Sequence, residues 1–164
     1  MLNYSNVITE EKSYTGLQMK EIKPIMKLII RGKKREFLSA IGKSLNLLLP
    51  TEANTSSRSD KLTALWLSPD EWMIYSNKIS SFDNNEYEIE NLLNKNISKM
   101  NLGAVTNVTD QFVLINIKGD KIFDLFATGS PFNFNDFRKK EGSVTQTILA
   151  KIDVIIHNQN KNEV

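Results

Sequence analysis

Apolar stretches alternate with polar turns along most of this 164-residue chain, and one arrangement occurs twice. Residues 27–42, KLIIRGKKREFLSAIG, read as an apolar strand, a glycine turn and an amphipathic helix. Residues 113–129, VLINIKGDKIFDLFATG, have the same order. The shared positions, 87 residues apart, are Gly32 and Gly119, Lys34 and Lys121, and Gly42 and Gly129. Because internal repeats constrain a fold strongly, this repeat predicts one domain built from two related halves.

Apolar residues at helical spacing predict three helices. The first spans residues 33–45, the second follows Gly119, and the third runs from an N-cap in residues 83–85 to about residue 99. Gly42 either weakens the first helix or caps its C-terminal end. The side chains expected to face inward are Phe37, Leu38, Ile41 and Leu45 in the first, Ile122, Leu125 and Phe126 in the second, and Ile89, Leu92, Leu93 and Ile97 in the third.

Shorter apolar runs bounded by turn residues predict strands and three hairpins. A single strand spans residues 25–31. The hairpins pair residues 62–67 with 71–75, residues 104–108 with 112–117, and residues 144–152 with 153–157. These connections are too short for parallel crossovers, so the pattern predicts an α+β fold with mainly antiparallel sheets and packed helices.

The two ends of the chain differ in character from its body. Residues 1–24 are polar without a clear period, and we expect a loosely ordered N-terminal arm unless a partner holds it. Residues 25–157 are expected to form a single duplicated α+β domain, followed by a polar tail over residues 158–164. Within the body, the aromatic segment 131–137 is expected to close one end of the core with Phe132, Phe134 and Phe137.

Composition narrows the function classes only slightly. Hydrophobic residues make up 40% and charged residues 24% of the chain, as in an ordinary globular protein. The formal net charge of +2 does not favour nucleic acid or a membrane surface as partner. The absence of cysteine excludes disulfides, thiolate metal sites and a cysteine nucleophile. With no signal-peptide pattern and no long apolar run, we expect a cytoplasmic protein.

Two motifs associated with catalysis do not fit their sequence context. His157 is the only histidine, so a histidine metal cluster is impossible, and a structural or surface role is favoured over a triad role. The sequence Gly42-Lys43-Ser44 looks like the end of a phosphate-binding loop, but that motif needs a glycine where Phe37 stands. It would also have to begin a helix, whereas this one falls at a helix end.

Charged residues form one basic cluster and two acidic pairs. The cluster contains Arg31, Lys33, Lys34 and Arg35, and the pairs are Asp70 with Glu71 and Asp120 with Asp124. The cluster could contact a phosphate or an acidic partner, but it lacks interleaved aromatic residues, so a solvated helical turn is favoured. The acids fit hairpin and helix-cap roles because the sequence indicates no group that would tune them for general acid–base work.

The last candidate functional residues are the two tryptophans and the polar triplet 145–147. Trp66 and Trp72, on the two arms of one hairpin, either pack in the core or anchor a protein interface, and both alternatives stay open. Thr145-Gln146-Thr147 forms either a solvent face of a strand or hydrogen bonds to a neighbouring backbone edge. No catalytic, cofactor-binding or metal-binding residue is predicted, which argues against an autonomous catalyst.

Three segments together carry a family resemblance. LWLSPDEWMIY at residues 65–75 resembles the L-W-L-x-P-D-E-W-L-L hairpin of the gamma subunit of heterotetrameric sarcosine oxidase. Residues 130–157 are similar to that family's C-terminal signature, and residues 104–129 resemble the segment between them. The C-terminal positions in register are Pro131, Phe137, Gly142, Gln146, Thr147, Leu149 and Ala150. Asn107 and Asn133 depart from aspartates common in the family pattern.

The resemblance implies a fold, a complex and a set of partners. The family is related to the folate-binding domains of aminomethyltransferases and YgfZ-type proteins, which implies two intertwined pseudo-symmetric halves. It implies a non-catalytic subunit that binds alpha, beta and delta subunits, chiefly alpha, in a complex that oxidatively demethylates sarcosine to glycine and hydrogen peroxide. FAD, FMN, NAD, zinc and tetrahydrofolate would then belong to the other subunits.

The sequence is also compatible with two other functions. The first is a free-standing folate- or one-carbon-binding protein of the aminomethyltransferase/YgfZ-like superfamily. Against it, the K-G-C-Y-x-G-Q-E signature of the YgfZ group is absent from the chain. The second is an unrelated adaptor that has kept the fold.

Overall fold

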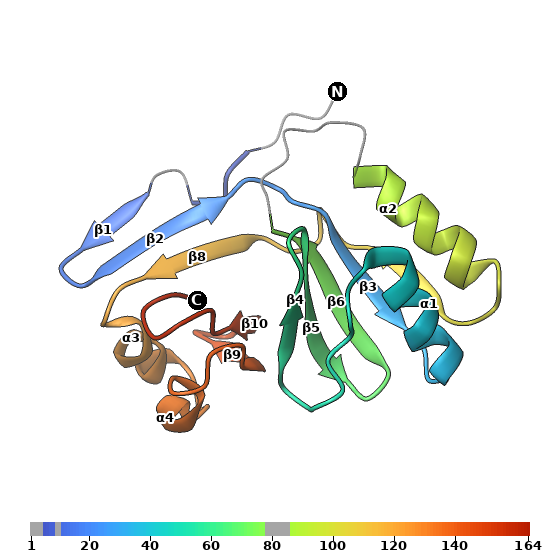
Figure 1. Cartoon of the computed structure of the whole chain (residues 1–164). Coiled ribbons are helices and arrows are strands. Elements are labelled where there is room, and N and C mark those ends of the chain that lie inside the picture. Colours follow the sequence, from blue (N-terminus) through green and yellow to red (C-terminus); the bar gives the residue numbers. More distant parts are fainter. Residues whose placement is uncertain (1–4, 9–10, 78–85) are drawn as a thin grey trace. The chain divides into compact units, whose positions relative to one another are not determined.

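The computed structural model describes residues 5–8, 11–77 and 86–164 (Figure 1). These residues form two compact units, one from residues 25–112 and one that combines residues 1–24 with residues 113–164. We call them the central unit and the terminal unit and describe each by itself. The strand pairs of both units are antiparallel, so the predicted α+β fold with mainly antiparallel sheets is confirmed.

The central unit contains a five-stranded sheet in the order β4-β5-β6-β3-β7. Its strands are β3 (Lys27–Arg31), β4 (Ser56–Arg58), β5 (Leu62–Ser68), β6 (Glu71–Ser76) and β7 (Ala104–Asn107). The predicted hairpin of residues 62–75 is confirmed as β5–β6, with Trp66 opposite Trp72 and a register shift between Trp66 and Ser68. β3 is an inner strand of the sheet because β6 pairs with one of its edges and β7 with the other.

The described residues of the central unit also form the helices α1 (Arg35–Leu45) and α2 (Glu86–Leu93) and the π-helical turn η1 (Asn94–Ser98). Gly42 lies inside α1, and the left-handed C-cap is Asn46 with φ of 50°, so Gly42 does not end the helix. The third predicted helix corresponds to α2 with η1. Its predicted N-cap at residues 83–85 lies outside the described residues.

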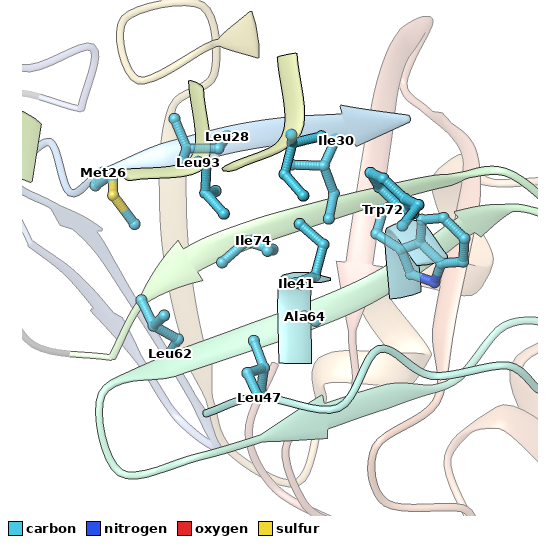
Figure 2. Packing of buried hydrophobic residues seen from close by; sticks show 12 residues of the cluster. Met26, Leu28, Ile30, Ile41, Leu47, Leu62, Ala64, Trp72, Ile74 and Leu93 are labelled. Carbon is cyan, nitrogen blue, oxygen red and sulfur yellow. The ribbon is translucent and has the colours of Figure 1, made fainter. Parts of the chain in front are cut away.

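The core of the central unit fills the space between one sheet face and the helices (Figure 2). Phe37 and Ile41 of α1 are fully buried, as are Leu28 and Ile30 of β3, because apolar residues recur every fourth position in the helix and every second position in the strand. Leu38 and Leu45 pack against this cluster. Leu92, predicted to face inward, is 39% exposed, so that prediction is wrong.

The terminal unit has a three-stranded sheet, β1-β2-β8, and a separate hairpin, β9–β10. Its elements are β1 (Lys12–Tyr14), β2 (Leu17–Ile22), β8 (Leu114–Lys118), α3 (Ile122–Gly129), α4 (Phe134–Phe137), β9 (Val144–Leu149) and β10 (Ile152–His157). The hairpin predicted for residues 104–117 is wrong, because β7 pairs with β3 and β8 pairs with β2. Residues 12–22 form two strands, which differs from the loosely ordered arm expected from their polarity.

Pairing with β8 explains why a polar segment becomes a strand. Met19 of β2 lies opposite Ile117 of β8, and both belong to the core of the terminal unit. Alternation places Leu17 and Met19 against that core, whereas Gln18 and Lys20 are exposed. A strand with only one buried face needs few apolar residues, so its hydrophobic signal in the sequence is weak.

Phenylalanine dominates the core of the terminal unit. Phe134 and Phe137 are buried and Phe132 packs against them, which agrees with the predicted aromatic plug. Ile122 and Phe126 of α3 are buried as predicted, but Leu125 is 40% exposed, so its predicted inward position is wrong. The buried face of α3 is completed by Phe123 instead.

Residues 158–164 make specific contacts within the terminal unit. Asn158 is fully buried, and its side-chain amide donates to the carbonyl oxygens of Phe137 and Lys140 at 2.8 and 3.0 Å. Val164 exchanges backbone hydrogen bonds of 2.9 and 3.0 Å with Ile117. These bonds extend the sheet beyond β8, so the polar tail contributes to the folded unit.

Candidate functional site

A pocket of about 160 Å³ opens between α3 and α4 in the terminal unit. Its apolar lining comes from Phe123 and Ala127 of α3 together with Phe132 and Phe134. The polar part of its wall consists of Asp124, Asn133, Asn135 and Arg138. We refer to it as the α3–α4 pocket.

Aromatic packing fixes the floor of this pocket. The ring of Phe123 lies 6.0 Å from that of Phe134, and the ring of Phe132 lies 4.9 Å from that of Phe134 at an interplanar angle of 68°. Such tilted and edge-to-face pairs are favourable beyond the area they bury. Asn133 orients α4 because its side-chain oxygen accepts a 3.0 Å hydrogen bond from the backbone N–H of Asn135.

Two opposite charges of the pocket wall lack ion pairs within the described residues. These are Asp124 of α3 and Arg138, the C-cap residue of α4. The neighbouring charges Asp136 and Lys139 do pair, at 2.9 Å. The sequence singled out Asp124 only as one of two nearby acids. It offered no signal for the pocket because the wall forms only when α3 and α4 pack together.

The basic cluster and the acidic pair Asp70-Glu71 meet at one end of β3 and β6. Arg31 lies opposite Glu71 in the sheet, with 3.7 Å between Nε and Oε2, and Lys33 approaches Asp70 at 3.6 Å. A hydrogen bond donated by the Ser68 hydroxyl, together with the charges of Lys33 and Arg31, holds the pKa of Asp70 below its usual value. These ion pairs therefore connect the end of β3 to the turn of the β5–β6 hairpin.

The two tryptophans have different surroundings. Trp72 is buried, its ring centroid is 5.9 Å from that of Phe37, and its Nε1 donates to the carbonyl oxygen of Pro50 at 2.8 Å. This is a core residue with a satisfied polar atom. Trp66 is half-buried and packs against the edge of the same core.

Other candidates also have structural positions. His157 ends β10 opposite Val144. Ser44 lies in the last turn of α1, where its hydroxyl accepts a 2.9 Å hydrogen bond from Asn96, so Gly42-Lys43-Ser44 has the wrong geometry for a phosphate loop. Thr145 is buried, and the hydroxyl of Thr147 lies 3.1 Å from that of Ser130.

Two other kinds of feature are absent from the described part of the chain. Residues 5–8, 11–77 and 86–164 contain no group of three or more acidic or histidine side chains arranged to hold a metal ion. None of the helices in these same ranges is long and apolar enough to cross a bilayer.

Comparisons with known proteins identify the family. A comparison with curated proteins gives no match. Among solved structures, the fold matches a chain of heterotetrameric sarcosine oxidase from Corynebacterium sp. U-96, crystallised in complex with pyrrole 2-carboxylate. The TM-score is 0.73 at 15% identity, over 90% of this chain and 72% of that one, which establishes a shared fold. The family model described as "Sarcosine oxidase, gamma subunit family" matches residues 32–163, most of the sequence. The chain therefore belongs to the sarcosine oxidase gamma subunit family.

Proposed function

We propose that this chain is the non-catalytic gamma subunit of a heterotetrameric sarcosine oxidase and supports assembly of that complex. The observation that carries the proposal is the family match across residues 32–163. The complex would convert sarcosine, dioxygen and tetrahydrofolate to glycine, hydrogen peroxide and methylenetetrahydrofolate. Oxidoreductase activity then belongs to the complex, and this chain contributes structure. We place it in the cytoplasm with its partners.

The cofactors are assigned to the other subunits. FAD, FMN and NAD would be held by the alpha and beta subunits, zinc by delta, and tetrahydrofolate by alpha. The α3–α4 pocket does not suit any of these larger cofactors. Pockets for cofactor-sized ligands have volumes of about 300–1,000 Å³. At about 160 Å³, this pocket is too small for a flavin or a folate.

Exposed apolar side chains of the terminal unit support a role in assembly. Ile148 and Ile152, which flank the turn of the β9–β10 hairpin, are 47% and 67% exposed, and Val113 before β8 is 48% exposed. Burial of such side chains against a partner is favourable because apolar surface leaves water. We expect the alpha subunit to cover part of this surface.

Co-expression tests the proposal directly. An affinity tag on this chain should recover alpha, beta and delta in equal amounts, with sarcosine-dependent hydrogen peroxide production. Omission of this chain should lower the yield of assembled alpha, beta and delta. Omission of alpha should release this chain from the remaining subunits, because alpha is its chief partner.

A free-standing folate-binding protein is the alternative that the same experiment separates. If the chain purifies alone, ignores the three other subunits and binds tetrahydrofolate at micromolar affinity, the subunit proposal is wrong. Recovery of the four-subunit complex without folate binding to the isolated chain contradicts the alternative.

A further inference from the structure

The second edge of β8 is covered by the tail along only part of its length. Ile117 exchanges backbone hydrogen bonds of 2.9 and 3.0 Å with Val164, and the N–H of Gly119 donates to the carbonyl oxygen of Asn162 at 2.9 Å. The backbone groups of Ile117 therefore point away from β2 and toward the tail. The tail pairs with β8 at residues 117 and 119.

The backbone groups of Ile115 point to the same edge. In an antiparallel sheet the N–H and C=O of every second residue point to one side, so Ile115 follows Ile117, while Leu114 and Asn116 bond to β2. The carbonyl of Val113 also points outward, because in a trans peptide it lies opposite the N–H of Leu114. None of the described residues hydrogen-bonds to these outward groups of Ile115 and Val113. An unpaired edge of this kind is a template for another strand.

The side chains along this open edge have an apolar and a polar side. Ile115 and Ile117 lie on the same face of the sheet because side chains alternate along a strand. Ile117 is buried in the core of the terminal unit, whereas Ile115 is 36% and Val113 48% exposed. On the opposite face, Asn116 lies across from Lys20 of β2. A strand added at this edge would therefore meet apolar side chains on one face and polar side chains on the other.

We propose that an extended segment of a partner subunit adds to this sheet along residues 113–115 of β8. Its apolar side chains lie beside Val113 and Ile115, and its polar side chains lie on the face of Asn116. The inference rests on the proposed assembly function and names the surface and the mode of contact. Backbone pairing supplies affinity, and the alternation of side chains supplies selectivity. A partner subunit is favoured over a second copy because the chain belongs to a family of subunits.

Hydrogen exchange at single backbone amides tests the strand pairing directly. In the isolated full chain, the amide of Ile115 should exchange quickly and those of Leu114 and Asn116 slowly, because only the latter two bond to β2. In the complex recovered by co-expression, exchange at Ile115 should become about tenfold slower or more. Exchange at Leu114 and Asn116 should change little.

A charged substitution tests the contribution of the edge to assembly. Ile115→Lys should lower recovery of the partner subunits about fivefold or more, because a lysine at a strand edge opposes pairing. Ile115→Val keeps an apolar β-branched residue and should preserve recovery. Leu125→Lys is the matched control, since Leu125 is also apolar and 40% exposed but lies on a helix. It should leave recovery unchanged within about twofold.

Three results would overturn the proposal. One is recovery of the complete complex with no slowing of exchange at Ile115, which would leave the assembly function intact. Another is protection of the Ile115 amide in a dimer of the isolated chain, which would assign the edge to a second copy. The third is failure of the wild-type chain to recover any partner subunit, which would overturn the assembly function together with this inference.

Discussion

The repeated unit of strand, glycine turn and helix occurs once in the central unit and once in the terminal unit. The strands and helices of the two copies begin at equivalent residues of the repeat, but the residues that each helix buries are not equivalent. β3 and β8 begin at Lys27 and Leu114, and α1 and α3 begin at Arg35 and Ile122, so both pairs are offset by 87 residues. The buried side chains of the helices follow another offset. Phe37 and Ile41 correspond to Ile122 and Phe126 at 85 residues.

A shift of two residues has a large effect on a helix. Each residue advances about 100°, so two positions turn the side chain by roughly 200°, to the opposite face. At the offset of 87, Phe37 corresponds to Asp124, which is exposed. The repeat therefore specifies where elements begin, while contacts within each unit decide which face they bury. Pseudo-symmetry of the two halves remains a prediction.

The largest expected effect comes from truncating the buried helix positions. Phe37→Ala should lower the free energy of unfolding by about 3–5 kcal/mol and Ile122→Ala by about 2–5 kcal/mol, because each leaves a cavity in a packed core. Asp124→Ala, at the offset of 87, should cost less than about 1 kcal/mol. Urea unfolding followed by circular dichroism measures all three. A cost for Asp124→Ala equal to that of Ile122→Ala would show that the buried offset is not 85.

The sequence could predict most elements and the short hairpins, but not the pairing between strands far apart in the chain. β5–β6 and β9–β10 were predictable because their turns are short and flanked by apolar runs. β7 and β8 also follow one another in the sequence, yet each pairs with a strand from elsewhere in the chain. The polar β2 pairs with β8 on one edge and with β1 on the other. Long-range pairing of this kind depends on the assembled sheet, which local patterns do not encode.

The same limit applies to the candidate site. Aromatic residues 132–137 were predictable as core because three phenylalanines recur within six positions. The α3–α4 pocket was not, because Asp124 and Arg138 come from separate elements and each fits an ordinary surface role. Leu125 was predicted inward because it is apolar, but Phe123 takes its place in the core. Because both residues are apolar, the sequence could not show which of the two side chains is buried.

Gly32 and Gly119 open the two turns of the repeat. We expect a side chain to be unfavourable at both positions, but for a different physical reason at each. Gly119 has φ of +136°, and an added Cβ would lie 2.1 Å from the backbone oxygen of Gly16. Gly32 has no such constraint, but its Cβ would lie 2.5 Å from the Phe37 ring. Gly119→Ala should cost about 2 kcal/mol or more, and Gly32→Ala about 1–3 kcal/mol. Urea unfolding measures both costs.

A double-mutant cycle sharpens this difference. In the Phe37→Ala background the ring is absent, so Gly32→Ala should become nearly neutral, whereas Gly119→Ala should keep its full cost. Gly42→Ala is the matched control. Its Cβ would meet no atom closer than 3.9 Å, so it should stabilise α1 by about 0.5–1 kcal/mol. An unchanged cost of Gly32→Ala without the ring would mean that backbone conformation, not packing, requires this glycine.

The strands of the two copies also differ in what covers their second edge. Strand β7 covers that edge of β3, whereas residues near 164 take this position beside β8. Asn116 of β8 donates to Glu163 Oε1 at 3.0 Å, and Lys118 lies 3.2 Å from the same oxygen. At this edge the second copy therefore combines backbone hydrogen bonds with side-chain contacts to the tail, whereas the first copy uses a regular strand.

The smallest expected effect tests this dependence through pH. Partial burial acts to raise the pKa of Glu163, but the hydrogen bond from Asn116 and the interaction with Lys118 outweigh it and hold the pKa below 4.5. The unfolded chain therefore takes up this proton first as the pH falls. The stabilisation is fully present above about pH 4.5 and disappears as the pH falls through the folded-state pKa. Glu163→Gln should cost about 0.2–1 kcal/mol at pH 7 and progressively less below pH 4.

Urea unfolding at several pH values between 7 and 3.5 measures the difference between the wild-type chain and Glu163→Gln. Glu141→Gln is the control, since Glu141 is an exposed glutamate with no ion pair among the described residues. If the two variants show the same pH dependence, the tail contacts do not stabilise β8. A difference confined to Glu163→Gln would instead mean that the side-chain contacts of Glu163 add to the backbone hydrogen bonds that hold β8 at this edge.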